Sequence, residues 1–266
     1  MPTGLGDEKL WLCPTLDNVT PFNDLSDQAN NGTAVGGLST VADTSNGGAF
    51  AYDLDGVGDY IRVPKANFAF LVETNSFSQS AWVRADSVGT GTFIASELTT
   101  SGKGTGLLIS GLTGNFLGFR ATANAGVYSP NTSSSTPVPS SQWFHVAWIV
   151  NGTTSTLYVD GVQIFQETGT FTTATGPLTS DVGVGCQFVN GSPNAFLDGL
   201  IDDVRIFDRP LNQAEIAHLS TARGITGSPP QGLGDEKLWL CPSINNSPND
   251  ISGNGNNGVY QGGLGT

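Results

Sequence analysis

The chain has 266 residues, of which 38% are hydrophobic, 36 are glycine and 14 are proline. This length suits one large sandwich or two smaller domains, and so much glycine without a collagen-like period is typical of short strands joined by tight turns. Ten basic residues face 23 acidic ones, so the formal net charge is −13 and a phosphate backbone would be repelled. These totals argue against nucleic-acid binding, and no stretch is long and apolar enough to predict membrane insertion.

The N-terminus, MPTGLGDEKLWLCP, lacks the basic region and apolar run of a secretory signal peptide. Three cysteines are present, and Cys13 and Cys241 occupy the same place in two copies of one motif, which leaves Cys186 as the other candidate partner. An odd number without close spacing does not form a disulfide framework. We therefore expect small buried thiols and assembly in a reducing compartment.

The sequence GLGDEKLWLCP occurs twice, at residues 4–14 and again at residues 232–242, and the similarity continues downstream of both copies. An internal repeat of this length indicates tandem modules. A segment as short as the second copy buries too little apolar surface to fold alone. It is therefore expected to dock on its own module or on a neighbouring subunit, in the slot otherwise filled by residues 9–13, unless the sequence cuts a module short. The predicted division is a sandwich in residues 1–224, a linker in 225–231 and a partial second repeat in 232–266.

Short alternating stretches between the two copies predict a succession of strands. Phe50, Tyr52 and Leu54 share one face of the first of these stretches. Phe77, Gln79, Ala81 and Val83 share one face of the strand FSQSAWV. Further strands are expected at residues 60–63, 93–96, 106–110, 115–120, 181–185 and 196–207. The polar, proline-containing stretch NTSSSTPVPSS, residues 131–141, predicts a loop.

The stretch QWFHVAWIVNGTTSTLYVDG, residues 142–161, predicts the central hairpin. Its first strand has large apolar groups on both faces, since Phe144 and Trp148 alternate with Ala147 and Ile149. A strand of this kind is expected to be covered on both sides. The Asn-Gly pair that follows tolerates the positive φ angles of a hairpin turn. The sequence therefore predicts a β-sandwich core.

The stretch RPLNQAEIAHLSTARG predicts a helix near the end of the sandwich. Asn212 can cap it, and Glu215 stands three residues later as the partner in a capping box. Ile216 and Leu219 would point back to a sheet. Gly224 is expected to stop the helix.

A family resemblance rests on the ordered succession of KLWLCPTLDN, ANNGTAVGG, YDLDGVGDYIRVP, SFSQSAWVRAD, QWFHVAWIVNG, TLYVDG and FLDGLIDDVRIFDRPLNQAEIAHL. In this order the motifs resemble the LamG-like jelly rolls of bacterial and viral proteins, from residue 9 to residue 224. The resemblance implies an all-β fold, a two-sheet antiparallel concanavalin A-like jelly-roll sandwich with one short C-terminal helix. It also implies a concave face that often carries ligands, and a noncatalytic role in adhesion, carbohydrate binding or particle surfaces.

The same resemblance implies a structural calcium ion (Ca2+), whose ligands would come from Asp17, Asp24, Gly56 and Asp202. Calcium takes carbonyl and water oxygens besides carboxylates, so a site with few acids is chemically admissible. The alternative is that Asp202 and Asp203 alternate across the sheet, one of them paired with Arg205 or a backbone donor, while the two earlier aspartates sit in turns.

The acidic residues do not form the paired carboxylates that glycoside hydrolysis requires. Glu73, Glu97 and Glu167 are isolated in the sequence. His145 lies within an apolar strand and is expected to be a hydrogen-bonded interior group, and His218 lies on the predicted helix, so the two form no metal pair or triad. We therefore expect that the protein is not an enzyme.

Three functional hypotheses remain. The leading one is a noncatalytic module on a virion or extracellular surface, most simply a decoration or tail-associated protein of a bacterial virus. Its loops or concave face would meet a glycan, and residues 232–266 would join neighbouring subunits. The second is a fragment of a secreted bacterial multidomain adhesin with calcium-dependent carbohydrate binding. The third is a glycan-active enzyme.

Overall fold

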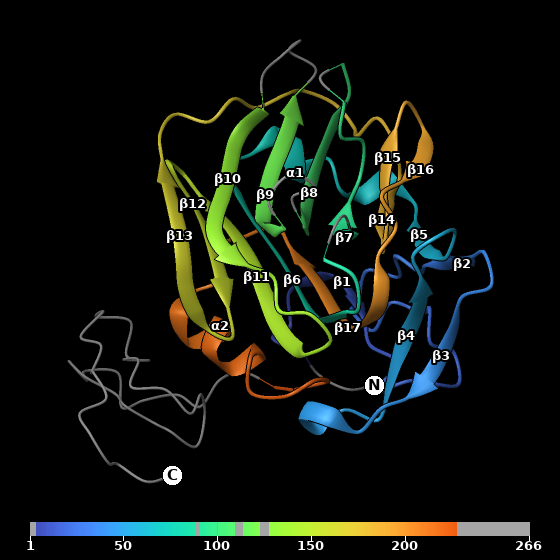
Figure 1. Cartoon of the computed structure of the whole chain (residues 1–266). Helices are drawn as coiled ribbons and strands as arrows, with labels where there is room; N and C mark the ends of the chain where they lie inside the picture. Colours follow the sequence, from blue (N-terminus) through green and yellow to red (C-terminus); the bar gives the residue numbers. More distant parts are fainter. Residues whose placement is uncertain (1–3, 89–90, 100, 110–113, 123–127, 228–266) are drawn as a thin grey trace, which may run out of the picture.

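The computed structural model describes residues 4–88, 91–99, 101–109, 114–122 and 128–227, with the backbone alone at Tyr128. Two large antiparallel sheets pack face to face in this part of the chain (Figure 1). The predicted all-β sandwich with a short C-terminal helix is thereby confirmed. The second copy of the repeat and the end of the predicted linker lie outside the described residues.

The first sheet has eight strands within the described residues, in the order β13-β12-β11-β6-β17-β4-β3, with β1 also paired to β17. Its strands are β1 (Glu8–Leu12), β3 (Ser39–Ala42), β4 (Phe50–Asp55), β6 (Ser76–Ala85), β11 (Trp143–Asn151), β12 (Thr154–Val159), β13 (Val162–Thr168) and β17 (Asp198–Phe207).

The second sheet has seven strands in the same part of the chain, in the order β10-β9-β8-β7-β14-β5-β2. Its strands are β2 (Thr33–Val35), β5 (Tyr60–Val63), β7 (Gly91–Ala95), β8 (Lys103–Ile109), β9 (Asn115–Thr122), β10 (Tyr128–Pro137) and β14 (Val182–Val184). A separate ribbon pairs β15 (Gln187–Val189) with β16 (Ser192–Asn194). The helical segments are η1 (Ser45–Gly47), η2 (Lys65–Asn67), α1 (Phe70–Glu73) and α2 (Gln213–Leu219).

The main hydrophobic core lies between the two sheets, and the alternation of β11 builds its centre. Phe144 packs edge to face on Phe116, with ring centroids 5.3 Å apart. Trp148 lies against β9, where a Cβ at Gly118 would come within 2.7 Å of the indole ring. The indole Nε1 donates to Ser155 Oγ at 2.8 Å, so this buried polar atom is satisfied. Position 118 must therefore stay without a side chain.

The other face of β11 is also buried, as the sequence predicts for a central strand. Ala147 and Ile149 form a second cluster with Phe207 and with Ile216 and Leu219 of α2. Figure 1 shows this helix lying at one end of the sandwich, close to the β12 and β13 strands. Two-sided coverage explains why both sets of alternating residues are apolar.

The helix α2 begins as predicted and ends early. Asn212 accepts from the backbone of Glu215 at 3.0 Å while the Glu215 carboxylate accepts from the Asn212 backbone at 2.8 Å, which completes the capping box. Its last residue is Leu219, so the prediction that Gly224 stops the helix is wrong. Beyond the helix, the Arg223 backbone N–H donates to Asn46 O at 2.9 Å in a distant loop.

The predicted loop at residues 131–141 is wrong for most of its length, because residues up to Pro137 belong to β10 and pair with β9. Two of its polar side chains, Thr132 and Ser134, face the interior and find partners there. Thr132 Oγ1 lies 2.5 Å from Ser155 Oγ, and both side chains are fully buried. A polar sequence can therefore form a strand of the sandwich when its buried hydroxyl groups are hydrogen bonded to each other.

The predicted buried thiols are confirmed for the two cysteines that the structure describes. Cys13 and Cys186 are buried and free. Burial raises the pKa of the Cys186 thiol to about 12 and that of the Cys13 thiol well above its usual value. Cys241 lies outside the described residues.

Candidate functional site

Strand β17 is shared at one edge by two partners, and a cluster of buried charged residues lies where they meet. Residues Asp198 to Ile201 pair with β4, and residues Val204 to Phe207 pair with β1. Asp202 and Asp203 fall between the two pairings, at an irregularity in the pairing with β6. Asp203 has a φ of 49°, which breaks the alternation so that both aspartates are buried.

Asp203 forms an ion pair with Arg205, as the alternative sequence interpretation allows. The guanidinium donates to both carboxylate oxygens, at 2.8 and 3.2 Å, and to Glu8 Oε1 at 3.1 Å. It also stacks over the Trp11 ring, 4.2 Å from its centroid, while the indole Nε1 donates to Asp203. This cluster fastens β1 to β17. The Gly224 backbone N–H also donates to Asp203 Oδ2 at 3.1 Å, which ties the segment after α2 to the same point.

Asp202 is fully buried beside it. Its Oδ1 accepts from the Asp203 backbone N–H at 2.7 Å, and its Oδ2 lies 2.5 Å from Thr15 Oγ1 and 3.6 Å from Arg223 Nη1. Burial raises the pKa of Asp202 to about 7, and the charge of Asp203 adds to the effect. The hydrogen bonds and Arg223 oppose this rise without cancelling it.

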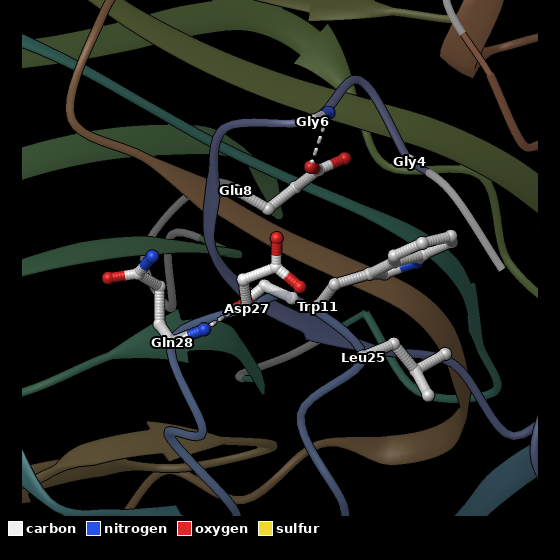
Figure 2. A pocket seen from close by; sticks show the side chains of 8 residues that line it. Gly4, Gly6, Glu8, Trp11, Leu25, Asp27 and Gln28 are labelled. Atoms are coloured by element: carbon white, nitrogen blue, oxygen red, sulfur yellow. Dashed lines mark hydrogen bonds between the residues drawn. The ribbon is translucent and has the colours of Figure 1, made fainter. Parts of the chain in front are cut away.

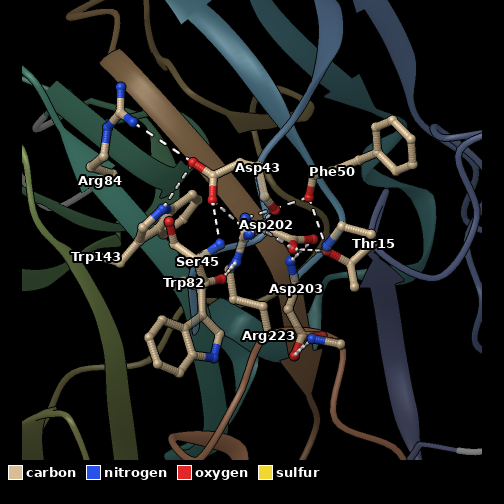
Figure 3. Close-up of polar contacts among 12 residues, drawn as sticks. Thr15, Asp43, Ser45, Phe50, Trp82, Arg84, Trp143, Asp202, Asp203 and Arg223 are labelled. Carbon is tan, nitrogen blue, oxygen red and sulfur yellow. Dashed lines mark hydrogen bonds and ion pairs between the residues drawn. The ribbon is translucent and has the colours of Figure 1, made fainter. Parts of the chain in front are cut away.

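The side chain of Arg223 is fully buried in a ring of oxygens that we call the Arg223 cage, shown in Figure 3. Its members are Asp43 O and Oδ1, Ser45 O, Phe50 O and Asp202 Oδ2. The guanidinium donates to Ser45 O at 2.9 Å and to Asp43 Oδ1 at 3.0 Å. Its carbon lies 4.1 Å from the centroid of the Trp143 ring, which closes one side.

The four residues predicted as calcium ligands have separate environments. Asp17 is on the surface, where hydrogen bonds from Thr20 lower its pKa. Asp24 is buried and both of its oxygens are saturated, since they accept from the Trp11 and Asn30 backbones at 2.8 Å and from the backbone and hydroxyl of Ser26. Gly56, with a φ of 72°, turns the chain after β4, and its N–H donates to Leu197 O at 3.0 Å.

These contacts bear on whether the predicted residues suit a calcium ion. In the described part of the chain, no group of three or more histidine, cysteine, aspartate or glutamate side chains is arranged to hold a metal. Beside Asp202, the oxygens that would serve calcium are already bonded to the Arg223 guanidinium. The residues at this position therefore do not fit a bound calcium ion while Arg223 is present.

An open depression lies on the same side of the molecule as β1 and involves two of the predicted residues. It has a volume of about 460 Å³ and is lined by Leu16, Asp17, Asn23, Asp24, Leu25, Ser26, Asp27, Ala29 and Asn31. We call it the loop depression. A smaller hollow, shown in Figure 2, adjoins it through Leu25, Ser26 and Asp27 and continues to Glu8 and Trp11.

Hydrogen bonds to the buried Asp24 carboxylate fix the backbone around the loop depression. Because this carboxylate collects four donors, the loop that carries Asn23 to Asn31 is fixed against β1. Asn31 Oδ1 in turn accepts from the Asp24 backbone at 2.9 Å. The side chains of Asn23, Asp27 and Gln28 are exposed on this fixed loop and offer amide and carboxylate groups to a ligand.

The isolated glutamates have structural partners. Glu97 is buried and accepts from Ser180 Oγ at 2.8 Å and from the backbones of Asn190 and Gly191, which holds the turn of the β15–β16 ribbon. Glu73 accepts from Gly176 N at 2.7 Å, and Glu167 accepts from Asn131 N at 3.1 Å. Each carboxylate joins two segments of chain.

His145 is buried, as predicted, but its ring is not fully hydrogen bonded. Within the described residues its Nδ1 has no partner. Burial lowers the pKa of His145 to about 3, and the charge of Arg205 acts in the same direction. The ring is therefore neutral and packs against Trp82, with centroids 5.7 Å apart.

Sequence reasoning missed Arg223, Asp43 and Trp143 as members of one cluster. Arg223 and Asp43 are 180 positions apart in the chain, and nothing in the local pattern links them. The sequence hints at buried ion pairs only through its excess of acidic residues, 23 against ten basic ones. This excess gives each arginine several possible carboxylate partners but does not say which one it binds.

Comparisons with known proteins agree with this architecture. The family model of the concanavalin A-like lectin/glucanases superfamily (Laminin_G_3) matches residues 55–217. Among curated proteins, none matches the chain. In the described residues, no helix is long and apolar enough to cross a membrane.

Solved structures with the same fold include domain 4 of an extracellular arabinanase from Geobacillus stearothermophilus, in complex with arabinotriose. It has a TM-score of 0.60 and 22% identity, over 81% of this chain and 98% of that one. The binding domain of botulinum neurotoxin serotype C1 has a TM-score of 0.58 and 17% identity, over 80% of this chain and 51% of that one. The chain thus spans about half the length of that neurotoxin domain. A further neurotoxin chain, of type C, comes from a structure that concerns interaction with two ganglioside molecules, and it has a TM-score of 0.58, 18% identity and coverage of 80% and 50%.

Proposed function

Because the chain belongs to the concanavalin A-like lectin/glucanase superfamily, we propose that it is a noncatalytic glycan-binding module that works at a surface. The observation that carries the proposal is the loop depression, an open hollow whose rim exposes carboxylate and amide groups on a fixed loop. Two of the solved neighbours are named for arabinotriose and ganglioside interactions, which supports a saccharide as the ligand class.

The chemistry of the depression suits a saccharide. Sugar hydroxyls both donate and accept hydrogen bonds, and the Asp27 carboxylate can accept while the Asn23 amide can do both. Leu16 and Leu25 give the same hollow an apolar surface for the C–H faces of a sugar ring. Convergent polar groups on a partly apolar, preformed hollow are the usual form of a small-molecule site. The net charge of −13 favours a neutral or cationic saccharide over a sulfated one.

A glycan array with three forms of the chain tests this proposal. The unaltered chain is expected to bind a defined set of oligosaccharides. Asp27→Ala removes a charged hydrogen-bond partner and is expected to weaken binding by about 10- to 100-fold, because such bonds contribute about 1.5–3 kcal/mol. The matched control is Asp53→Ala, which removes an exposed aspartate on β4 and is expected to bind as the unaltered chain does. Equal loss in both variants, or in neither, would contradict the proposal.

For the finer role, we propose a module of a particle surface, in the manner of a virion decoration or tail-associated protein. The repeated motif supports this assignment. Residues 232–242 have the same sequence as residues 4–14, and the first copy supplies β1, whose Glu8 and Trp11 bind the Arg205 and Asp203 cluster. The second copy carries the same glutamate and tryptophan. It could therefore occupy the β1 slot of a neighbouring subunit.

The alternative is a fragment of a secreted adhesin, and one pair of measurements separates the two. The particle role predicts that mass spectrometry detects the protein in purified virions. The adhesin role predicts its presence in particle-free medium and glycan binding that EDTA abolishes. Detection only in particle-free medium would remove the particle role, and glycan binding that survives EDTA would remove calcium-dependent recognition.

A further inference from the structure

The smaller hollow beside the loop depression differs from it in size. It has a volume of about 100 Å³, against about 460 Å³ for the depression, and the two share Leu25, Ser26 and Asp27. Figure 2 shows that Glu8 also stands in the wall of this hollow. We propose that the saccharide bound in the loop depression is an amino sugar whose protonated amine enters the smaller hollow, an inference that rests on the proposed glycan-binding function and names its ligand class.

The walls of the two cavities are acidic. Asp17, Asp24 and Asp27 line the depression, and Glu8 lines the smaller hollow with Asp27. In the described part of the chain, none of the lining residues is a lysine, an arginine or a histidine. A cleft lined by charges of one sign focuses the electric field and attracts ligands of the opposite sign. The lining therefore favours a cationic sugar over a neutral one.

Two of these aspartates lack a cation in the folded protein. Asp27 is exposed, and among the described residues its carboxylate has no hydrogen bond or ion pair. Asp24 is buried, and its donors are uncharged groups of the backbone and of Ser26. A protonated amine would donate hydrogen bonds to Asp27 and would bring a positive charge close to both carboxylates.

Glu8 can accept one more hydrogen bond. Its Oε1 accepts from Leu5 N at 2.8 Å and from Arg205 Nη1 at 3.1 Å, and its Oε2 accepts from Gly6 N at 3.0 Å. An ionised carboxylate has about four acceptor positions, and contacts within the described residues use three. Because Arg205 also pairs with Asp203, one guanidinium faces two carboxylates and this cluster stays net negative.

The two volumes suit different parts of one ligand. The depression can hold a sugar ring against Leu16 and Leu25, while the smaller hollow has room only for a substituent of the ring. An ammonium group is compact and donates three hydrogen bonds from one atom. Acetylation of the same nitrogen would remove the charge and enlarge the group, so we expect the N-acetylated sugar to fit the hollow less well on both counts.

Isothermal titration calorimetry of the full chain, with EDTA present, tests the proposal. Three trisaccharides of the same linkage serve as probes, made of glucosamine, N-acetylglucosamine and glucose. At a pH where the amine is protonated, the glucosamine trisaccharide is expected to bind about 10- to 100-fold more tightly than the other two, because hydrogen bonds between charged groups are stronger than neutral ones. This preference should shrink as salt is added, since salt screens exposed charges.

Substitution of Asp27 locates the preference. Asp27→Asn keeps the size of the side chain and removes its charge. It is expected to lower the affinity for the glucosamine trisaccharide about tenfold or more and to change that for the N-acetylglucosamine trisaccharide far less. The matched control, Asp53→Asn on β4, is expected to keep both affinities. The backbone amide NMR signals of Gly6 and Gln28, which line the smaller hollow, are expected to shift with the glucosamine trisaccharide alone.

Tri-lysine provides a control for attraction by the net charge of −13. It carries amines but no sugar ring to fill the depression, so it should bind more weakly than the glucosamine trisaccharide. Equally tight binding of tri-lysine would overturn the proposal.

The remaining outcomes separate this proposal from the glycan-binding function. If the chain binds other glycans on the array but shows no preference for the glucosamine trisaccharide, the amino-sugar assignment is overturned and the function stands. The same follows if Asp27→Asn keeps the full preference. If the chain binds no saccharide at all, both are overturned.

Discussion

Replacing Asp202 by asparagine tests the electrostatics of the buried region directly. Burial and the neighbouring Asp203 raise the pKa of Asp202 from 3.8 to about 7, so the folded protein holds this proton more tightly than the unfolded chain. The stability contributed by the group is then fully present below about pH 4 and is lost as the pH rises through about 7. Each pH unit in this window corresponds to about 1.36 kcal/mol. Between pH 5 and pH 8 the loss amounts to about 3 kcal/mol.

The assay is urea unfolding of the unaltered chain and of Asp202→Asn at half-unit steps from pH 5 to pH 8. The free energy of unfolding of the unaltered chain, minus that of the variant, is expected to fall by about 3 kcal/mol across this range. The pH dependence of groups that both proteins share cancels in this difference. One such group is Asp43, whose pKa is lowered despite burial because Ser45, Trp143 and Arg223 bond to it. Asp53→Asn, an exposed replacement, should show no such trend. A difference that stays constant, or grows with pH, would refute the reasoning.

Three other substitutions probe separate parts of the fold, each by chemical denaturation. Arg205→Leu leaves Glu8 and Asp203 buried without their cation and is expected to cost about 3–5 kcal/mol; a loss under 1 kcal/mol would mean that the cluster contributes little. Gly118→Ala places a methyl group 2.7 Å from the Trp148 ring and is expected to cost about 1–3 kcal/mol, whereas Gly58→Ala, in open space, serves as its control. Asn212→Ala removes the α2 cap and is expected to cost about 1 kcal/mol, with unchanged stability as the contrary result.

The regular parts of the fold could be predicted from the sequence because their causes are local. In β11, large apolar residues on both faces require cover on both sides, and the structure supplies the core on one side and α2 on the other. The capping box of α2 is likewise contained in four consecutive residues. Periodicity and capping act over short distances, so one sequence is enough to see them.

The errors have long-range causes. Residues 131–137 read as a loop because they are polar, yet Thr132 faces the interior, where Ser155 of another strand satisfies it. The arginine beside Asp202 follows α2 and was likewise missed, because no local pattern connects the two residues. Neither partner could be identified without knowing which strands lie side by side.

The most direct test of glycan recognition is a map of backbone amide NMR shifts during titration with an oligosaccharide that is positive on the array. The account predicts that the largest changes fall on residues 16–17, 23–27, 29 and 31, which line the loop depression. It also predicts that Asp27→Ala removes most of them. Changes concentrated on the outer surface of β8 and β9, with residues 23–31 unaffected, would contradict the assigned site.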